Sequence, residues 1–273
     1  MFRKGYRYTH SGKRKIMQDL KVTLVQFDQE WENISANFSH ISRLLEKCVH
    51  TDLVVLPEMY HTAFSMNVSL AENWLNHSAV EQLKSWSHHY GFAIYTSLMV
   101  EDEGKFFNRG VFVLSDGSIH YYDKRRSFGL GGEDQFYHSG DTETIVTYLG
   151  WKINLQICYD LRFPELIRNR IEQNGHPAYD VLLYVANWPK KRISHWSTLL
   201  PARAIENQCY VIGVNRVGID GNQLEYSGAS AVFDGLGQTL VELNECETVQ
   251  SVTLSASQLD ELRQSLPFLK DRK

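Results

Sequence analysis

Short apolar runs of strand length alternate with helical segments along this chain, and this alternation constrains the fold more than any other feature. Leu53–Leu56 and Val181–Ala186 are apolar throughout, as strands buried on both faces usually are. Apolar residues at helical spacing lie within Trp31–His50, and residues 78–90 and Ile193–Asn207 are also predicted helices. The same alternation of apolar runs and helical segments occupies both halves of the chain. It predicts an α/β fold with two sheets packed face to face and helices outside.

Two Asp-Gly pairs predict β-hairpins within this pattern. Asp116-Gly117 lies between the apolar runs Val111–Leu114 and Ile119–Tyr122. The second pair, Asp234-Gly235, follows another apolar run. We therefore expect antiparallel strands to extend the sheets.

Three chemically reactive side chains lie where predicted strands end. Glu58 follows Leu53–Pro57, Lys124 follows the strand that begins at Ile119, and Cys158 follows an apolar run from Ile153. Catalytic groups gather at strand ends in layered α/β folds. The three strand ends are therefore candidates for one shared site.

Together these residues make a complete set for acyl transfer. A thiol such as Cys158 needs a base or a nearby cation before it attacks at neutral pH. Glu58 can act as that base, because partial burial raises the pKa of a glutamate toward the working range. Lys124 can favour the thiolate and stabilise the oxyanion of a tetrahedral intermediate.

Each residue also has an ordinary structural explanation that is favoured when the residue is taken alone. Cys158 could be a small core residue, and Glu58 could cap a helix. Lys124 begins the basic run Lys124-Arg125-Arg126, which could be a solvated surface. His61 and His195 could in principle partner the cysteine, but the glutamate and lysine already supply the chemistry.

The sequence around the three residues decides between these explanations. Leu56-Pro57-Glu58, Tyr122-Asp123-Lys124 and Ile157–Glu165 resemble, in order, the three signatures of the nitrilase or carbon–nitrogen hydrolase superfamily. The resemblance covers about residues 20–257. It implies a four-layer αββα sandwich, a cysteine thioester mechanism and hydrolysis of non-peptide C–N bonds. It implies neither a metal nor an organic cofactor.

The resemblance also implies a role for each matching residue. Glu58 corresponds to the general base, Lys124 to the oxyanion-binding lysine and Cys158 to the nucleophile. Glu133 best fits the second glutamate that many members carry, although it could instead be an acid of a surface loop. The backbone N–H of Tyr159 is the expected second oxyanion donor.

Within the superfamily the chain is most similar to the ω-amidase branch. The runs Val185–Pro189 and Leu199–Asn207 carry this similarity, and Arg125–Phe128 and Gly129–Gly132 depart from it. The branch implies hydrolysis of the terminal carboxamide of small dicarboxylic acid ω-amides, of the 2-oxoglutaramate or 2-oxosuccinamate type. Alternatives are another aliphatic amidase, an N-carbamoyl amino acid hydrolase, or a nitrilase-like protein that only binds ligands.

Substrate-binding candidates lie beside the signature residues. An ω-amide carries a carboxylate at its far end, which Arg162, Arg125 or Arg126 could bind. Arg162 could equally pair with a neighbouring acid such as Glu165 or support the subunit contact. Trp188 and Phe64 could form walls of the pocket or belong to the core, and Tyr159 lies beside the nucleophile.

Composition limits the partners of the chain. Its net charge of -4 does not suggest a nucleic-acid-binding surface, and no apolar run approaches the length of a membrane span. The Cys residues, 4 in all, are widely spaced and predict neither a zinc site nor a disulfide framework. We expect a small carboxamide and water as reactants, and a cytoplasmic location.

The ends of the chain and its association are further expectations. Residues 1–16 are basic and polar and are predicted to be a disordered extension, whereas residues 17–273 form a single carbon–nitrogen hydrolase domain. A homodimer or higher homo-oligomer is expected, with a helix over Pro164–Glu172 and the segment Leu259–Leu269 packed across a two-fold axis. The leucines of the second segment could equally be buried in the monomer core.

Overall fold

The computed structural model describes residues 17–272, so the extension predicted over residues 1–16 lies outside the described residues. The strands of the first sheet are β1 (Leu20–Gln26), β2 (Leu53–Val55), β3 (Glu72–Asn73), β4 (Ala93–Asp102), β5 (Lys105–Val113), β6 (Ile119–Asp123) and β15 (Thr248–Leu254). They run in the order β15-β1-β2-β4-β5-β6, and β3 also pairs with β4. The central pairs β1–β2 and β2–β4 are parallel, which fits the wholly apolar β2.

The second sheet repeats this plan. Its strands are β7 (Ile145–Tyr148), β8 (Trp151–Ile157), β9 (Val181–Val185), β10 (Tyr210–Val214), β13 (Ala231–Phe233) and β14 (Thr239–Glu242). They run in the order β14-β13-β10-β9-β8-β7, again with a parallel centre. A separate hairpin is formed by β11 (Val217–Ile219) and β12 (Glu225–Ser227). Both predicted Asp-Gly hairpins are confirmed, as β5–β6 and β13–β14.

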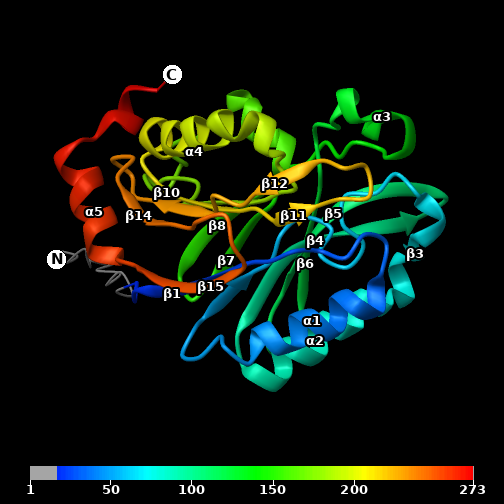
Figure 1. Cartoon of the computed structure of the whole chain (residues 1–273). Coiled ribbons are helices and arrows are strands. Elements are labelled where there is room, and N and C mark those ends of the chain that lie inside the picture. Colours follow the sequence, from blue (N-terminus) through cyan, green and yellow to red (C-terminus); the bar gives the residue numbers. More distant parts are fainter. Residues whose placement is uncertain (1–16, 273) are drawn as a thin grey trace, which may run out of the picture.

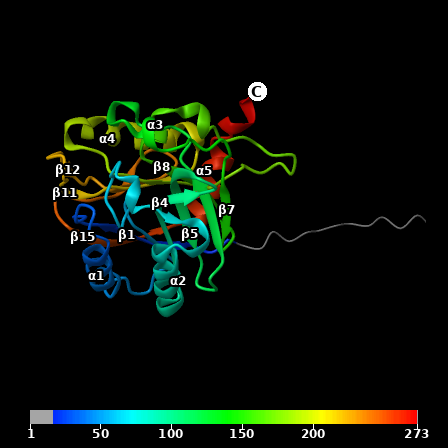
Figure 2. The same ribbon diagram turned by 90° about the vertical axis from the view of Figure 1, so that its right-hand side faces the viewer.

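Helices cover the outer faces of both sheets (Figures 1 and 2). The α-helices are α1 (Ile34–Leu45), α2 (Ser78–Tyr90), α3 (Glu133–Phe136), α4 (Ile193–Asn207) and α5 (Ala256–Ser265). Helices α1 and α2 pack on the first sheet, and α4 packs on the second, where Leu200 lies against Gly213 of β10. The four-layer αββα sandwich is therefore confirmed. None of the helices within residues 17–272 has the length and apolar character needed to cross a membrane.

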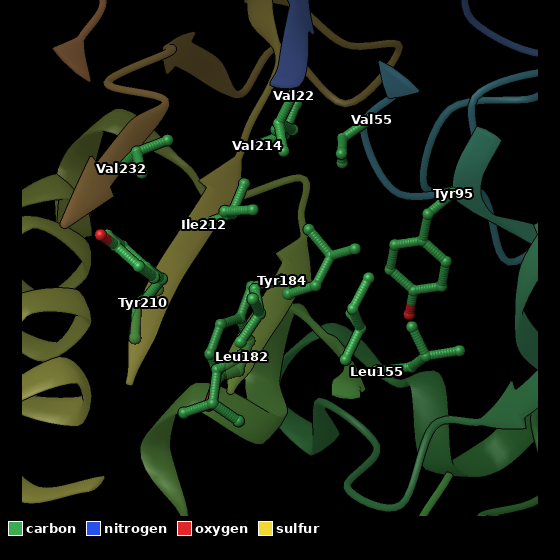
Figure 3. Packing of buried hydrophobic residues seen from close by; sticks show 14 of the residues in the cluster. Val22, Val55, Tyr95, Leu155, Leu182, Tyr184, Tyr210, Ile212, Val214 and Val232 are labelled. Atoms are coloured by element: carbon green, nitrogen blue, oxygen red, sulfur yellow. The ribbon is translucent and has the colours of Figure 1, made fainter. Parts of the chain in front are cut away.

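The main core lies between the two sheets. Val22, Val55 and Tyr95 of the first sheet are fully buried and belong to one cluster with Leu155 and Ile212 of the second. Figure 3 shows Tyr95 reaching across this interface toward Leu155. Its hydroxyl donates a hydrogen bond to the carbonyl oxygen of Gln156, at 3.1 Å. This bond ties β4 to the strand that leads into Cys158.

The prediction of a helix over Pro164–Glu172 is wrong. Only short 3-10 turns follow Cys158, and the rest of this segment is irregular. Side chains from elsewhere bind its backbone: Arg125 donates to the carbonyl of Leu166 at 2.9 Å, and Arg272 donates to that of Asn169 at 2.8 Å. These tertiary bonds satisfy carbonyls that an α-helix would otherwise use. The 3-10 helices of the chain are Val68–Leu70, Trp74–Asn76, Gly129–Gly131, Cys158–Arg162, Pro164–Leu166, Lys190–Arg192 and Phe268–Asp271.

Candidate active site

The sandwich brings the predicted catalytic residues together at one end of the facing sheets. Glu58 lies just beyond β2 and Lys124 directly follows β6, both from the first sheet. Cys158 directly follows β8 of the second sheet, and Glu133 begins α3. Residues from separate parts of the sequence thus meet because their strands end at the same place.

Lys124 forms a buried ion cluster with two glutamates. Its Nζ donates to Glu58 Oε1 at 2.9 Å and to Glu133 Oε1 and Oε2 at 2.8 and 2.9 Å. Glu58 and Glu133 are 0% exposed, and Lys124 is 2% exposed. Buried charges are tolerated when they are paired and hydrogen-bonded, as they are here. The cluster therefore holds both carboxylates and the ammonium in a fixed arrangement.

Asparagine side chains complete the bonding of the glutamates. Asn108 of β5 donates through Nδ2 to Glu58 Oε1 at 2.7 Å and to Glu133 Oε1 at 3.1 Å. Asn187 donates its backbone N–H to Glu58 Oε2 at 2.8 Å and its side-chain amide to the Glu58 carbonyl at 2.6 Å. Neither asparagine is among the residues that the sequence predicted to act in the site. β5 carries Lys105 and Arg109 as well as Asn108, so the sequence offered no signal that set Asn108 apart.

Cys158 occupies a sharp turn between β8 and a 3-10 helix. Its φ is +42°, a left-handed conformation that costs a non-glycine residue energy and is common at functional sites. Asp160 fixes this turn, because its Oδ2 accepts the N–H of Ile157 at 3.1 Å and its Oδ1 accepts that of Arg126 at 3.0 Å. The hydroxyl of Tyr122 also donates to Oδ2, at 2.7 Å. The turn is thus tied to the segment that carries Lys124.

The electrostatics of the site favour a neutral thiol at rest. Burial raises the pKa of Cys158 well above its ordinary value, and the nearby Glu58 carboxylate raises it further. Lys124 opposes this change. Burial also lowers the pKa of Lys124, but Glu133, Glu58 and Cys158 outweigh that effect and raise it above its ordinary value. The lysine is therefore a permanent cation, and the thiol needs a base for attack.

A pocket opens over the sulfur. Its cavity volume is about 100 Å³, and all predicted substrate-binding residues, namely Tyr159, Arg162, Trp188 and Phe64, line it. Cys158 itself lines the cavity and is 9% exposed. A further lining residue that the sequence did not single out is Arg192.

The structure decides several of the alternatives left open by the sequence. Glu58 precedes no helix and bonds to Lys124, so it is not a helix cap. Lys124 is buried, so it does not belong to a solvated surface. Arg162 does not pair with Glu165, whose carboxylate lies 3.8 Å from Arg126. Glu133 is buried on Lys124 and is not an acid of a surface loop.

His195 and His61 do not bond to Lys124 or to its two glutamates. His195 Nδ1 lies 3.1 Å from Arg162 Nη1, and both ring nitrogens of the fully buried His61 are without a hydrogen-bond partner among the described residues. Residues 17–272 also contain no group of three histidine, cysteine or acidic side chains arranged to hold a metal ion.

Comparison with known proteins agrees with this geometry. The family model described as carbon-nitrogen hydrolase matches residues 21–264. The chain belongs to the carbon–nitrogen hydrolase family. The Omega-amidase YafV of Yersinia enterocolitica is 41% identical over 257 residues, which cover 93% of this chain and 97% of that protein. The 2-oxoglutaramate amidase of Paenarthrobacter nicotinovorans is 34% identical, over 93% of this chain and 89% of that protein.

A solved structure gives the same result for the fold. A CN-hydrolase superfamily protein from Xanthomonas campestris, with an arsenic adduct in its active site, superposes with a TM-score of 0.92. It is 42% identical, and the match covers 94% of this chain and 98% of that one. This chain is thus a hydrolase of carbon–nitrogen bonds with the αββα fold of its superfamily.

Close packing around Lys124 in this hydrolase leads to a prediction for Gly140. A Cβ at Gly140 would lie 2.4 Å from the backbone oxygen of Asp123, which cannot move without moving Lys124. We expect Gly140→Ala to lower the free energy of unfolding by roughly 1–3 kcal/mol and to reduce kcat. Denaturant unfolding and steady-state kinetics would measure both. Gly129→Ala is the control, since its Cβ would meet nothing closer than 3.6 Å, and an equal loss in both variants would contradict the explanation.

The buried Asp160 leads to a prediction about pH. Burial raises the pKa of Asp160 from 3.8 to about 6, against the opposing effect of the hydrogen bond from Tyr122. The folded chain therefore holds this proton more tightly than the unfolded chain does. Asp160 therefore contributes its full stabilisation when the pH is below the pKa that it has in the unfolded chain. This contribution is lost as the pH rises through the pKa that it has in the folded chain.

Asp160→Asn cannot titrate and so isolates this contribution. We expect the free energy of unfolding of the wild type, minus that of Asp160→Asn, to fall by roughly 2–3 kcal/mol between about pH 4 and about pH 7. Urea unfolding of both proteins across this range would measure it. A difference that stays constant, or that rises with pH, would show that Asp160 does not titrate in this way.

Proposed function

We propose that this protein is an ω-amidase that hydrolyses the terminal carboxamide of small dicarboxylic acid ω-amides, of the 2-oxoglutaramate or 2-oxosuccinamate type. The observation that carries the proposal is the placement of the Cys158 thiol in the pocket, near the buried cluster of Glu58, Lys124 and Glu133. Relatives named ω-amidase and 2-oxoglutaramate amidase, at 41% and 34% identity, support the same substrate class.

The first half of the reaction forms a thioester. Sγ of Cys158 attacks the amide carbonyl carbon while Glu58 takes the thiol proton. The carbonyl π electrons move to oxygen, and the resulting oxyanion is stabilised by Lys124 and the backbone N–H of Tyr159. Tyr159 suits this task because the first N–H groups of a helix have no intrahelical partner. The oxyanion then collapses, the C–N bond breaks, and Glu58 returns the proton to the departing ammonia.

The second half regenerates the thiol. Glu58 takes a proton from water as the water oxygen attacks the thioester carbonyl. Lys124 and the Tyr159 amide stabilise the second oxyanion in the same way. When this intermediate collapses, the C–S bond breaks and Glu58 gives the proton back to sulfur. Glu133 acts by holding Lys124, and through the backbone N–H of Phe128, which donates to its Oε2 at 2.6 Å, it also fixes one wall of the pocket.

The position of Arg162 supports the proposal of an acidic substrate. It lies in the pocket with its guanidinium 4.6 Å from the ring centre of Trp188. No carboxylate of residues 17–272 pairs with it. A half-buried guanidinium without a counter-ion favours an anionic ligand, and the far carboxylate of an ω-amide is such a ligand.

Ammonia release across a small panel tests the proposal. The panel contains 2-oxoglutaramate, 2-oxosuccinamate, glutamine, asparagine, aliphatic amides, N-carbamoyl amino acids and a nitrile. We expect the highest kcat/KM for the first two compounds. Carbon dioxide released together with ammonia would indicate the carbamoyl substrate instead. Binding of these compounds without any turnover would favour the non-catalytic alternative.

Three wider properties are also proposed. Residues 17–273 form one hydrolase domain. The protein acts in the cytoplasm, because its nucleophilic thiol must stay reduced, and Cys48, Cys158, Cys209 and Cys246 are all free. The chain associates into a homodimer or higher homo-oligomer. Leu259 and Leu269 are buried within the chain itself. In Pro164–Glu172 and Leu259–Leu269, the exposed Ile171 and Phe268 and the half-buried Leu262 and Leu266 are apolar side chains that remain for such a contact. A monomer by light scattering at micromolar concentration would contradict the association.

A further inference from the structure

Two arginines rather than one face the pocket. Arg192 ends the 3-10 helix that precedes α4, and its guanidinium lies 5.2 Å from the ring centre of Phe128. Arg162 lies 5.7 Å from the ring centre of Tyr159. The rings of Phe128 and Tyr159 are themselves 5.1 Å apart, in an edge-to-face contact. The two guanidinium groups therefore lie at either end of one aromatic pair on the pocket wall.

Neither guanidinium has an acidic partner within residues 17–272. Neighbouring cations on the rim are paired: Arg126 lies 3.8 Å from Glu165, and Lys190 lies 2.9 Å from Glu245. Arg162 lies over the rings of Tyr159 and Trp188 and beside His195 Nδ1, and Arg192 lies over the Phe128 ring. The chain thus leaves two like charges facing the same cavity, which is unfavourable without a bound anion.

Among the described residues one carboxylate, that of Asp220, lines the cavity, and its hydrogen bonds are already made. Asp220 is 4% exposed, and its Oδ1 accepts the N–H groups of Asn222 and Leu224 at 2.8 and 3.0 Å. Its Oδ2 accepts the hydroxyl of Tyr226 at 2.9 Å. Asp220 therefore shapes the loop of the β11–β12 hairpin rather than neutralising the arginines.

The charges of Arg162 and Arg192 favour an anion site between the two guanidinium groups. Burial lowers the pKa of Arg162, and the positive charge of Arg192 lowers it further, so the two groups are close enough to repel each other. A carboxylate between them would remove this repulsion and accept charge-assisted hydrogen bonds from both.

We propose that Arg192 is a specificity-determining residue that binds, together with Arg162, the carboxylate at the far end of the substrate. The proposal rests on the ω-amidase function proposed above and names the residue that distinguishes acidic from neutral amides. Arg192 does not take part in bond making or breaking. Its removal should raise KM for acidic amides far more than it changes kcat.

Kinetics with a matched substrate pair test this role. We expect Arg192→Gln to lower kcat/KM for 2-oxoglutaramate roughly 10- to 100-fold, mainly through KM, because a hydrogen bond to a charged group is lost. The neutral amide pentanamide, which lacks the carboxylate, should change less than about threefold. Arg192→Lys should recover part of the loss. Lys191→Gln removes the same charge one position away, outside the pocket lining, and should leave both substrates unchanged.

A binding measurement keeps this test independent of turnover. In a Cys158→Ala background, calorimetry should show that Arg192→Gln weakens binding of the dianion 2-oxoglutarate roughly 10-fold or more. Equal losses for the acidic and the neutral amide, or unchanged binding of 2-oxoglutarate, would overturn the role of Arg192. A wild-type protein that hydrolyses pentanamide but not 2-oxoglutaramate would instead overturn the proposed function.

Discussion

Cys158→Ala is expected to abolish amide hydrolysis, with kcat reduced by roughly four to six orders of magnitude. A thioester needs a thiol, and Cys158 is the one cysteine that lines the pocket among residues 17–272. The variant should stay folded, because alanine fits the space of a small buried side chain. Ammonia release measures the activity, and thermal unfolding measures the stability.

Cys209→Ala is the matched control for this prediction. Cys209 is also buried, at 0% exposed, but it does not line the pocket. We expect this variant to keep its turnover with at most a modest loss of stability. Turnover that survives Cys158→Ala, or that is lost equally in both variants, would mean that Cys158 is not the nucleophile.

Lys124→Met should damage both stability and activity. It leaves the carboxylates of Glu58 and Glu133 buried without a cation, and breaking a buried ion pair in this way costs roughly 3–5 kcal/mol. Loss of the oxyanion partner should lower kcat at least about 100- to 1,000-fold. Denaturant unfolding and ammonia release measure the two effects.

A second substitution separates these two effects. In Lys124→Met combined with Glu133→Gln, one unpaired charge is removed, so part of the stability should return while activity stays lost. The exposed ion pair of Lys84 and Glu81 is a control, because Lys84→Met there should change stability by less than about 1 kcal/mol. Recovery of kcat together with stability would show that Lys124 serves the fold rather than the reaction.

The elements that could be predicted from the sequence are those whose signals are local. The apolar β2 and β9, the Asp-Gly hairpins and α4 all formed where periodicity and turn residues indicated. The helix expected over Pro164–Glu172 did not form, although proline favours the start of a helix. Arg125 and Arg272, distant in sequence, bind the carbonyls of this segment instead, and such contacts leave no periodic trace.

The residues of the site also divide into those with a local sequence signal and those without one. Glu58, Lys124 and Cys158 lie in recognisable local contexts, and the structure brings them together as expected. Asn108 and Arg192 were missed because only the folded chain shows what they contact. Asn108 donates to two glutamates that are distant from it in sequence, and Arg192 lies over the ring of Phe128, also distant in sequence.

Mass spectrometry after a rapid quench tests the central claim, that Cys158 carries a thioester intermediate. The wild-type protein is mixed with 2-oxoglutaramate, quenched in acid and digested. We expect the peptide that contains Cys158 to gain the mass of the substrate acyl group, and the gain to be absent from Cys158→Ala. Steady turnover without any such adduct, or an adduct on another residue, would contradict the mechanism.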